Sequence, residues 1–275
     1  MQIYSSARTA VDWGASELLA AFPELADIEV SATDQKELDV LLRKLGDNVD
    51  AFFKYFPNTA SVEEVRQECF DAGGRLLARS DRNYGYLMLA HLEQEAGLRE
   101  YRTDNKGNPM GQSGLERGFM LTMMFAGSTL HFHPSHQAGS RFRYLGMASK
   151  AKAHVIAFAQ RPDTAKTAGY LRLPDRGIVI LIQGLAWVDP RNFQIVRMHT
   201  ELLAPRGDVG LRKQSTEIQF SEVVLPKVSR SFWLPLQVIV AINYQGSLYR
   251  NRHRYKEYKL FTVETFEKII RPATW

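Results

Sequence analysis

The chain has 275 residues, of which 45% are hydrophobic and 24% are charged, so it can bury a full-sized core and is not a disordered chain. Its one cysteine, Cys69, excludes an intrachain disulfide and any motif of paired cysteines. The net charge of +5 is unevenly distributed: residues 141–275 hold 22 Lys and Arg against 10 Asp and Glu, and residues 1–140 hold 13 against 20.

The N-terminal sequence MQIYSSARTAVDWG has neither the basic start nor the continuous apolar run of a secretory signal. No stretch of about eighteen apolar residues, the length of a membrane-spanning helix, occurs in the chain. We therefore expect either a cytoplasmic protein or a mature chain whose leader has been removed.

The first fifth of the chain has the pattern of helices. A run of apolar residues with spacings of three and four predicts a helix over 35–56, with Asp34 and Glu37 as its N-terminal cap and Pro57 after its end. A shorter helix is expected over 15–22. The apolar face of the longer helix consists of Leu38, Leu41, Leu42, Leu45, Val49, Phe52, Phe53 and Phe56.

The rest of the chain is rich in β-branched and aromatic residues, in runs of about ten separated by turn residues such as Asp189-Pro190-Arg191-Asn192 and Gln245-Gly246-Ser247. There is no alternation of strands and helices, and no phosphate-binding glycine motif occurs, so a parallel-sheet nucleotide-binding fold is not expected. Strands are predicted at 62–70, 75–92, 97–104, 140–147, 153–160, 177–188, 193–203, 213–225, 232–244 and 247–262.

These elements predict a mainly β (α+β) fold. About ten consecutive antiparallel strands cannot stay flat, and an unclosed sheet must have its curved face covered. We expect a curved antiparallel half-barrel with N-terminal helices and an inserted apolar helix on its concave face. Residues 1–275 are predicted to form a single domain, with a helical segment, 1–58, followed by the sheet, 59–275.

The inserted helix is predicted over 114–126, within SGLERGFMLTMMFAGSTLHFHPSHQ. Ser113 and Glu116 form a capping box, and Gly127 suits a C-terminal cap. Because apolar residues cover every side, the helix is expected to be buried, either as ordinary core or as a mobile plug whose methionines repack around a ligand. The candidate ligand contacts are Phe119, Met120, Met123, Met124 and Phe125.

Three histidines follow the predicted plug. His131 and His133 would share one face of a strand, and with His136 they could bind zinc and an activated water, which makes a metal-dependent hydrolase an alternative function. No acidic residue lies between positions 130 and 159 to orient a ligand or act as base. The pattern therefore favours histidines that are hydrogen-bonded at a strand end, with no metal or other cofactor.

A basic cluster, RNRHRYKEYK, lies at 250–259. Arg250, Arg252, Arg254 and Lys256 could contact an acidic protein partner or anionic headgroups, which would suit an interaction or sensor domain. A solvated strand face is the simpler interpretation, and a nucleic-acid surface is not favoured.

The hairpin at 184–203 places Trp187, Asp189, Pro190, Phe193 and Arg197 in the pattern W-x-D-P-x-x-F-x-x-x-R. It resembles a strand–turn–strand unit of the outer-membrane lipoprotein-sorting proteins, the LolA-like superfamily, and FWLPLQVIV followed by YRNRHRYKEYKLF resembles the closing strands of that family. TLHFHPSHQ, VIAFAQRP and WVDP...QIVR resemble motifs of a group of uncharacterised envelope proteins of that type. In the hairpin, Trp187 and Phe193 are expected to face each other.

This resemblance implies a non-enzymatic protein of the periplasm or cell envelope that carries a lipid or lipoprotein acyl chain or senses an acylated protein. Helices 35–56 and 114–126 would then be lid and plug over the concave face, and Trp187 and Trp233 would be candidates for its wall.

Overall fold

The structure of the protein is a computed structural model, which describes residues 2–5, 7–28, 35–91, 97–104, 106–108, 125–165, 169–172 and 177–261. None of the helices in these ranges is long and apolar enough to cross a membrane. The helices are α1 (Gln2–Ser5), α2 (Ala15–Ala21), α3 (Gln35–Tyr55) and the short 3-10 helices η1 (Pro23–Leu25), η2 (Ala126–Phe132), η3 (Gln137–Gly139) and η4 (Gly207–Val209).

Ten strands form one open antiparallel sheet in the order β3-β2-β1-β12-β11-β10-β9-β8-β5-β4, and β6 and β7 form a separate pair. The strands are β1 (Thr59–Phe70), β2 (Leu76–His91), β3 (Gly97–Thr103), β4 (Ser140–Ala148), β5 (Ala153–Gln160), β6 (Gly169–Arg172), β7 (Gly177–Ile180), β8 (Ile182–Val188), β9 (Ile195–Leu202), β10 (Leu211–Val224), β11 (Ser231–Tyr244) and β12 (Ser247–Leu260). The predicted class, a curved antiparallel sheet that does not close, is confirmed.

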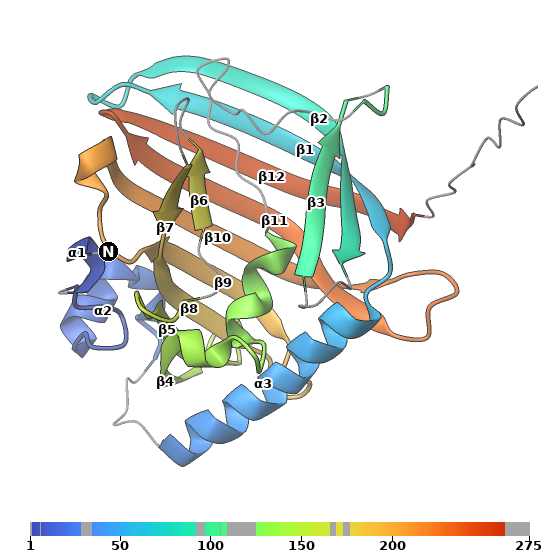
Figure 1. Ribbon diagram of the computed structural model, residues 1–275, viewed down its shortest axis with the longest axis horizontal. Helices are drawn as coiled ribbons and strands as arrows, with labels where there is room; N and C mark the ends of the chain where they lie inside the picture. The colour runs from blue at the N-terminus through green and yellow to red at the C-terminus, as the bar shows by residue number, and fades with distance from the viewer. Residues whose placement is uncertain are drawn as a thin grey trace, which may run out of the picture.

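The sheet curves so that its edge strands, β3 and β4, come round toward the side where α3 and η2 lie (Figure 1). α3 packs against β4 and η2, and η2 also contacts β3. The predicted apolar stripe of α3 is buried in one large cluster with inward-facing side chains of β2, β4, β5 and β8 to β12. We call this side of the sheet the inner face.

The opposite, outer face of the sheet has its own cover. Along β5 and β8 the side chains alternate: Ile156 and Ala186 join the inner cluster, whereas Val155 and Leu185 join a second cluster with the N-terminal segment. Leu18, Phe22 and Leu25 of α2 and η1 are fully buried in that second cluster. The sheet is therefore packed on both faces around β5 and β8.

The strand predicted over 177–188 is in fact two. β7 ends at Ile180 and pairs with β6, which the sequence pattern did not predict. β8 begins at Ile182 and pairs with β5 and β9 in the main sheet. Leu181 between them is buried, and its carbonyl oxygen accepts a hydrogen bond of 2.8 Å from the backbone N–H of Leu203. The apolar run continues across the break, because Ile178, Ile180 and Leu181 are all buried, so composition alone did not show the break.

The predicted helix 114–126 falls almost entirely outside the described residues. Its last two residues, Phe125 and Ala126, lie at the start of η2. The chain stays helical through Phe132, and Gly127 has no left-handed backbone, so the predicted cap at Gly127 is wrong. The other described helices, α2 and α3, agree with the predictions over 15–22 and 35–56. That the whole chain is one domain stays a prediction.

Trp187 and Phe193 do not face each other across the β8–β9 hairpin. Trp187 lies opposite Arg197 in the register, and the Arg197 guanidinium lies 4.4 Å from the centre of the indole ring. Phe193 takes a left-handed backbone at φ 56° in the turn and packs at the edge of the inner cluster. The W...R part of the motif is therefore a cross-strand cation–π pair.

The backbone of β9 approaches Gly184 of β8 so closely that a substitution there tests the packing of the main sheet. A Cβ added there would lie 2.0 Å from the carbonyl oxygen of His199 and 2.8 Å from Cα of Thr200, both backbone atoms of β9. We expect Gly184→Ala to lower the free energy of unfolding by about 1–3 kcal/mol or more, as overpacking does. Urea denaturation is the measurement. Gly177→Ala on β7, where an added Cβ meets no atom within 4 Å, is the control and should leave the midpoint nearly unchanged.

Candidate functional site

The inner face is an apolar wall covered by α3, η2 and β7. Five apolar residues of α3, and Phe56 just after it, are at most 5% exposed, and Phe52 and Phe56 form edge contacts with Phe232 of β11 at ring distances of 6.1 and 5.4 Å. The buried cluster contains Leu38, Leu41, Leu45, Val49 and Phe53 from α3, Phe56, and Ile195, Met198, Ile218, Phe220, Phe232, Leu234, Val238 and Val240 from the sheet.

A cavity of about 20 Å³ remains between α3 and this wall. Trp233, one of the two predicted wall residues, lines it and is partly buried. A space of this size holds about one water molecule. An acyl chain could therefore enter this part of the inner face only if α3 or η2 moved. The cavity lining consists of Leu45, Asn48, Val49, Phe52, Thr129, Gln194, Ile195, Phe220 and Trp233.

Trp187, the other predicted wall residue, lies on the outer face. It is 2% exposed and packs with Leu18 and Phe22 under the N-terminal helices. The error has a simple cause, since side chains alternate along a strand and the sequence did not indicate which parity of β8 points inward. Trp187 is therefore not part of the wall of the inner face.

Of the five predicted plug residues, Phe125 is described, and Phe119, Met120, Met123 and Met124 lie outside the described residues. Phe125 is 3% exposed, and its ring lies 5.0 Å from that of His253 on β12. Its backbone N–H donates to Glu100 Oε2 at 3.1 Å, and the N–H of Gly127 donates to Glu100 Oε1 at 3.2 Å. Glu100 on β3 therefore holds the start of η2 against the sheet.

Glu63 is the centre of a buried polar group on the same face. Its carboxylate accepts hydrogen bonds from Arg102 Nε and, at 2.7 Å, from Arg102 Nη2. His253 Nδ1 lies 2.8 Å from Glu63 Oε1, and the Tyr255 hydroxyl donates to the same oxygen at 2.7 Å. All four side chains are buried. Three strands, β1, β3 and β12, therefore meet at one carboxylate.

The pKa values of this group are set by burial and by the ion pair. Burial alone raises the pKa of Glu63, but the charge and hydrogen bonds of Arg102 and the contact with His253 outweigh it and lower the pKa to about 2. Burial lowers the pKa of His253, although Glu63 opposes this. At neutral pH the group therefore contains ionised Glu63, charged Arg102 and an uncharged imidazole, so its net charge is zero.

Tyr86 extends the polar group toward η2. Its hydroxyl donates to Glu100 Oε2, and its ring lies 4.9 Å from that of Tyr255. Burial and then the charge of Glu100 raise the pKa of Tyr86 well above its ordinary value, so the phenol stays a donor. The polar contacts of β1, β2, β3 and β12 are thereby linked to the element that covers them.

The three predicted metal ligands lie in and just after η2, not on a strand. His131 stacks on Phe158 at a ring distance of 5.5 Å, and burial lowers its pKa to about 4. The Nδ1 atoms of His133 and His136 lie 2.8 and 2.9 Å from the hydroxyl oxygen of Ser135. Among the described residues, no group of three His, Cys, Asp or Glu side chains is arranged to hold a metal ion. The geometry therefore does not support the hydrolase alternative.

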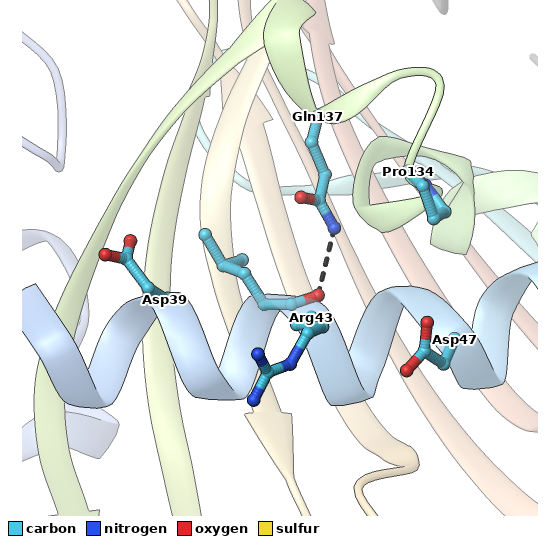
Figure 2. Close-up of a pocket in the computed structure, with 6 residues that line it drawn as sticks. Asp39, Arg43, Asp47, Pro134 and Gln137 are labelled. Atoms are coloured by element: carbon cyan, nitrogen blue, oxygen red, sulfur yellow. Dashed lines mark hydrogen bonds between the residues drawn. The ribbon is translucent and has the colours of Figure 1, made fainter.

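A groove of about 290 Å³ separates α3 from the loop that follows η2, and Figure 2 shows its lining residues. Gln137 spans the groove: its Nε2 donates to the carbonyl oxygen of Leu42 on α3 at 3.0 Å and to that of Phe132 at 2.8 Å. Asp39, Arg43 and Asp47 lie along the helix side. Four of its six lining residues are charged or polar, so the groove does not extend the apolar wall.

The basic residues of β12 point to the outer face. Lys256 Nζ lies 2.7 Å from a carboxylate oxygen of Glu64, and Arg250 Nε lies 3.8 Å from one of Glu68, both on β1. Arg252 and Arg254, between them, are exposed. This is the mixed-charge pattern of a solvated strand face, and nothing in the contacts supports an acidic partner or anionic headgroups there.

Sequence reasoning missed Glu63, Arg102 and His253 as a group. His253 was hidden in the basic cluster of 250–259, and Glu63 in a run of acidic residues. The alternation of residues along the strand could have identified His253, because His253 and Tyr255 alternate with the exposed Arg252 and Arg254. That parity places His253 on the inner face. The partners on β1 and β3 follow only from the register.

No protein-family model and no curated protein matches the sequence. The similar solved structures include a domain assigned to outer membrane lipoprotein-sorting proteins from Vibrio parahaemolyticus, at 8% identity and a TM-score of 0.35, and a DUF1329 family protein from Desulfovibrio piger, at 9% and 0.34. Each alignment covers 82% of this chain and 94% of the other. The first is of the class that the hairpin 184–203 resembles. Because both TM-scores are low, we infer nothing from them about what this chain binds.

The Glu63 ion pair makes stability depend on pH. Because the pKa of Glu63 falls from 4.5 to about 2 on folding, the unfolded chain binds more protons between those values, and stability falls as pH falls through them. The contribution lost is on the order of 3 kcal/mol. We expect the double variant Glu63→Gln/Arg102→Met, compared with the wild type by urea denaturation from pH 6 to pH 2.5, to show a shallower decline.

Glu63→Gln alone is the matched comparison. It leaves the Arg102 charge buried without its carboxylate, so it should destabilise by about 3–5 kcal/mol at neutral pH, more than the double variant. Equal declines with pH in the wild type and the double variant would contradict the assignment to Glu63.

Proposed function

We propose that this protein binds a long apolar chain, the acyl group of a lipid or of a lipid-modified protein, against the inner face of the sheet. It would act in the cell envelope as a carrier or sensor, without catalysis. The observation that carries the proposal is that a broad apolar wall on β9, β10 and β11 is covered by α3 and η2, which are not themselves part of the sheet.

A small number of hydrogen bonds and ion pairs hold α3 in place over the inner face. Asn48 Nδ2 donates to the carbonyl oxygens of Asn192 and Phe193 at 2.7 and 3.0 Å, and Gln137 donates to that of Leu42. His133 Nε2 lies 3.2 Å from the exposed carboxylate of Asp50. Lys44 lies over the Phe193 ring and Arg230 over the Tyr55 ring. The large buried part of the contact is apolar, and apolar contact is non-directional, so another apolar surface can replace it.

The energies of cover and ligand are of the same order. Burying six large apolar side chains of α3 is worth roughly 1.5–3 kcal/mol each, or on the order of 10 kcal/mol in all. Burying an acyl chain of about 14 carbons is worth on the order of 10 kcal/mol, at about 0.8 kcal/mol per CH₂. An exchange between α3 and an acyl chain is therefore close to balance, which suits reversible loading and release.

Native mass spectrometry of the purified protein tests the proposal directly, together with displacement of a fluorescent fatty acid. We expect a hydrophobic ligand to copurify or a 14-carbon chain to bind at micromolar concentration. If no such ligand copurifies and none binds, the inner face is ordinary core and the proposal is wrong.

Asn48→Ala distinguishes a movable cover from a fixed one. It removes two hydrogen bonds that hold α3 to the β8–β9 turn, and a cost to docking of about 1 kcal/mol raises the open population about fivefold. Because the apparent Kd varies inversely with that population, affinity for the fluorescent fatty acid should rise about fivefold. Fluorescence titration measures it.

Asp47→Ala, on the exposed side of the same helix, is the control and should leave the affinity unchanged. If Asn48→Ala lowers the thermal stability and affinity does not rise, then α3 does not open on binding.

A further inference from the structure

Two buried polar atoms of the group around Glu63 have no hydrogen-bond partner among the described residues. They are Arg102 Nη1 and His253 Nε2. The side chains of Arg102 and His253 are 1% and 0% exposed, so water does not reach these atoms freely. A buried polar atom without a partner costs about 1–3 kcal/mol, and native proteins rarely keep one without a reason.

The two side chains converge on one atom. Arg102 Nη2 and His253 Nδ1 lie 2.7 and 2.8 Å from the same carboxylate oxygen, Glu63 Oε1. The unpartnered atoms belong to the same guanidinium and the same imidazole. They therefore lie on two neighbouring side chains of the inner face, on β3 and β12.

Their chemistry is fixed by Glu63. An ionised carboxylate only accepts hydrogen bonds, so His253 must carry its proton on Nδ1, and an uncharged imidazole then has a lone pair on Nε2. Arg102 Nη1 is a donor. The region therefore offers one donor and one acceptor in an environment whose net charge is zero.

The region is covered by the start of η2. The Phe125 ring packs on the His253 ring, and Glu100 holds the N–H groups of Phe125 and Gly127. A shift of this segment, in addition to the movement of α3 that the proposed acyl-chain binding requires, would uncover the His253 side of this region.

We propose that Arg102 and His253 form a subsite for the polar head of the bound ligand, and that this head is an uncharged group with both a donor and an acceptor, such as an amide or a hydroxyl. This inference rests on the proposed function and names the ligand class of the same site. Arg102 donates to the carbonyl or hydroxyl oxygen of the head, and its N–H or O–H donates to His253 Nε2. A carboxylate head satisfies Arg102 but brings a negative charge toward the imidazole lone pair and the ionised Glu63.

The test compares four ligands with the same 14-carbon chain: the primary amide, the alcohol, the methyl ester, which only accepts hydrogen bonds, and the carboxylate. Displacement of a fluorescent probe at pH 7.5 gives their affinities. We expect the amide and alcohol to bind about tenfold more tightly than the ester, the effect of one unmet hydrogen bond. His253→Phe should abolish this preference.

Tyr255→Phe is the matched control, because it also removes one buried hydrogen bond to Glu63 Oε1 but contributes no unpartnered atom. It should keep the tenfold preference. In the wild type, ¹⁵N-histidine NMR should show the His253 Nε2 signal shifting with the amide but not with the ester, which tests the subsite even if His253→Phe does not fold.

Equal affinity for amide and ester, tightest binding of the carboxylate, an equal loss of preference in both variants, or an unmoved Nε2 signal would each overturn the subsite. If none of the four ligands binds the wild type at micromolar concentration, the proposed function itself fails.

Discussion

An open sheet with apolar side chains on both faces must have both faces covered, and the rest of this structure depends on how that is done. The two covers are held differently. The N-terminal segment is fixed to the outer face by polar contacts as well as by apolar packing, among them Arg141 with Asp12 at 2.7 Å and His199 with Glu24 at 2.6 Å. α3 is held to the inner face mainly by apolar packing. The position of the N-terminal segment is therefore specified by directional bonds. The position of α3 depends mainly on its apolar surface, which a bound hydrocarbon chain would also have.

The buried ion pair has a second consequence for the inner face. Glu63 and Arg102 cancel each other's charge at the end of an apolar wall, so polar recognition is possible there without attracting ions. A buried pair of this kind adds little net stability compared with apolar residues, but it fixes which groups can lie beside it. Tyr86 and Glu100 link the pair to the start of η2, so the polar region and its cover share hydrogen bonds.

Much of the fold follows from local patterns. The stripe from Leu38 to Phe56 defines α3, and strand composition with turn residues defines nine of the sheet strands closely, because both periodicities are set within a few residues. The features that the sequence did not predict depend on tertiary context: the break at Leu181, the 3-10 helix at the histidines and the face of the sheet on which Trp187 lies. The group around Glu63 could not be predicted for the same reason. Glu63, Arg102 and His253 meet only through the register of three strands, which no local pattern contains, and the residues before Phe125 stay a prediction.

The pairing of β1 with β12 joins strands from near the two ends of the chain at the middle of the sheet. Glu63 and His253 are separated by 190 positions. Two of the residues that hydrogen-bond to Glu63, His253 and Tyr255, come from β12. A nascent chain that does not yet contain β12 therefore holds an incomplete hydrogen-bond group at Glu63 and an unpaired β1 edge. A chain interrupted before β12 exposes that edge as a template for aggregation or chaperone capture.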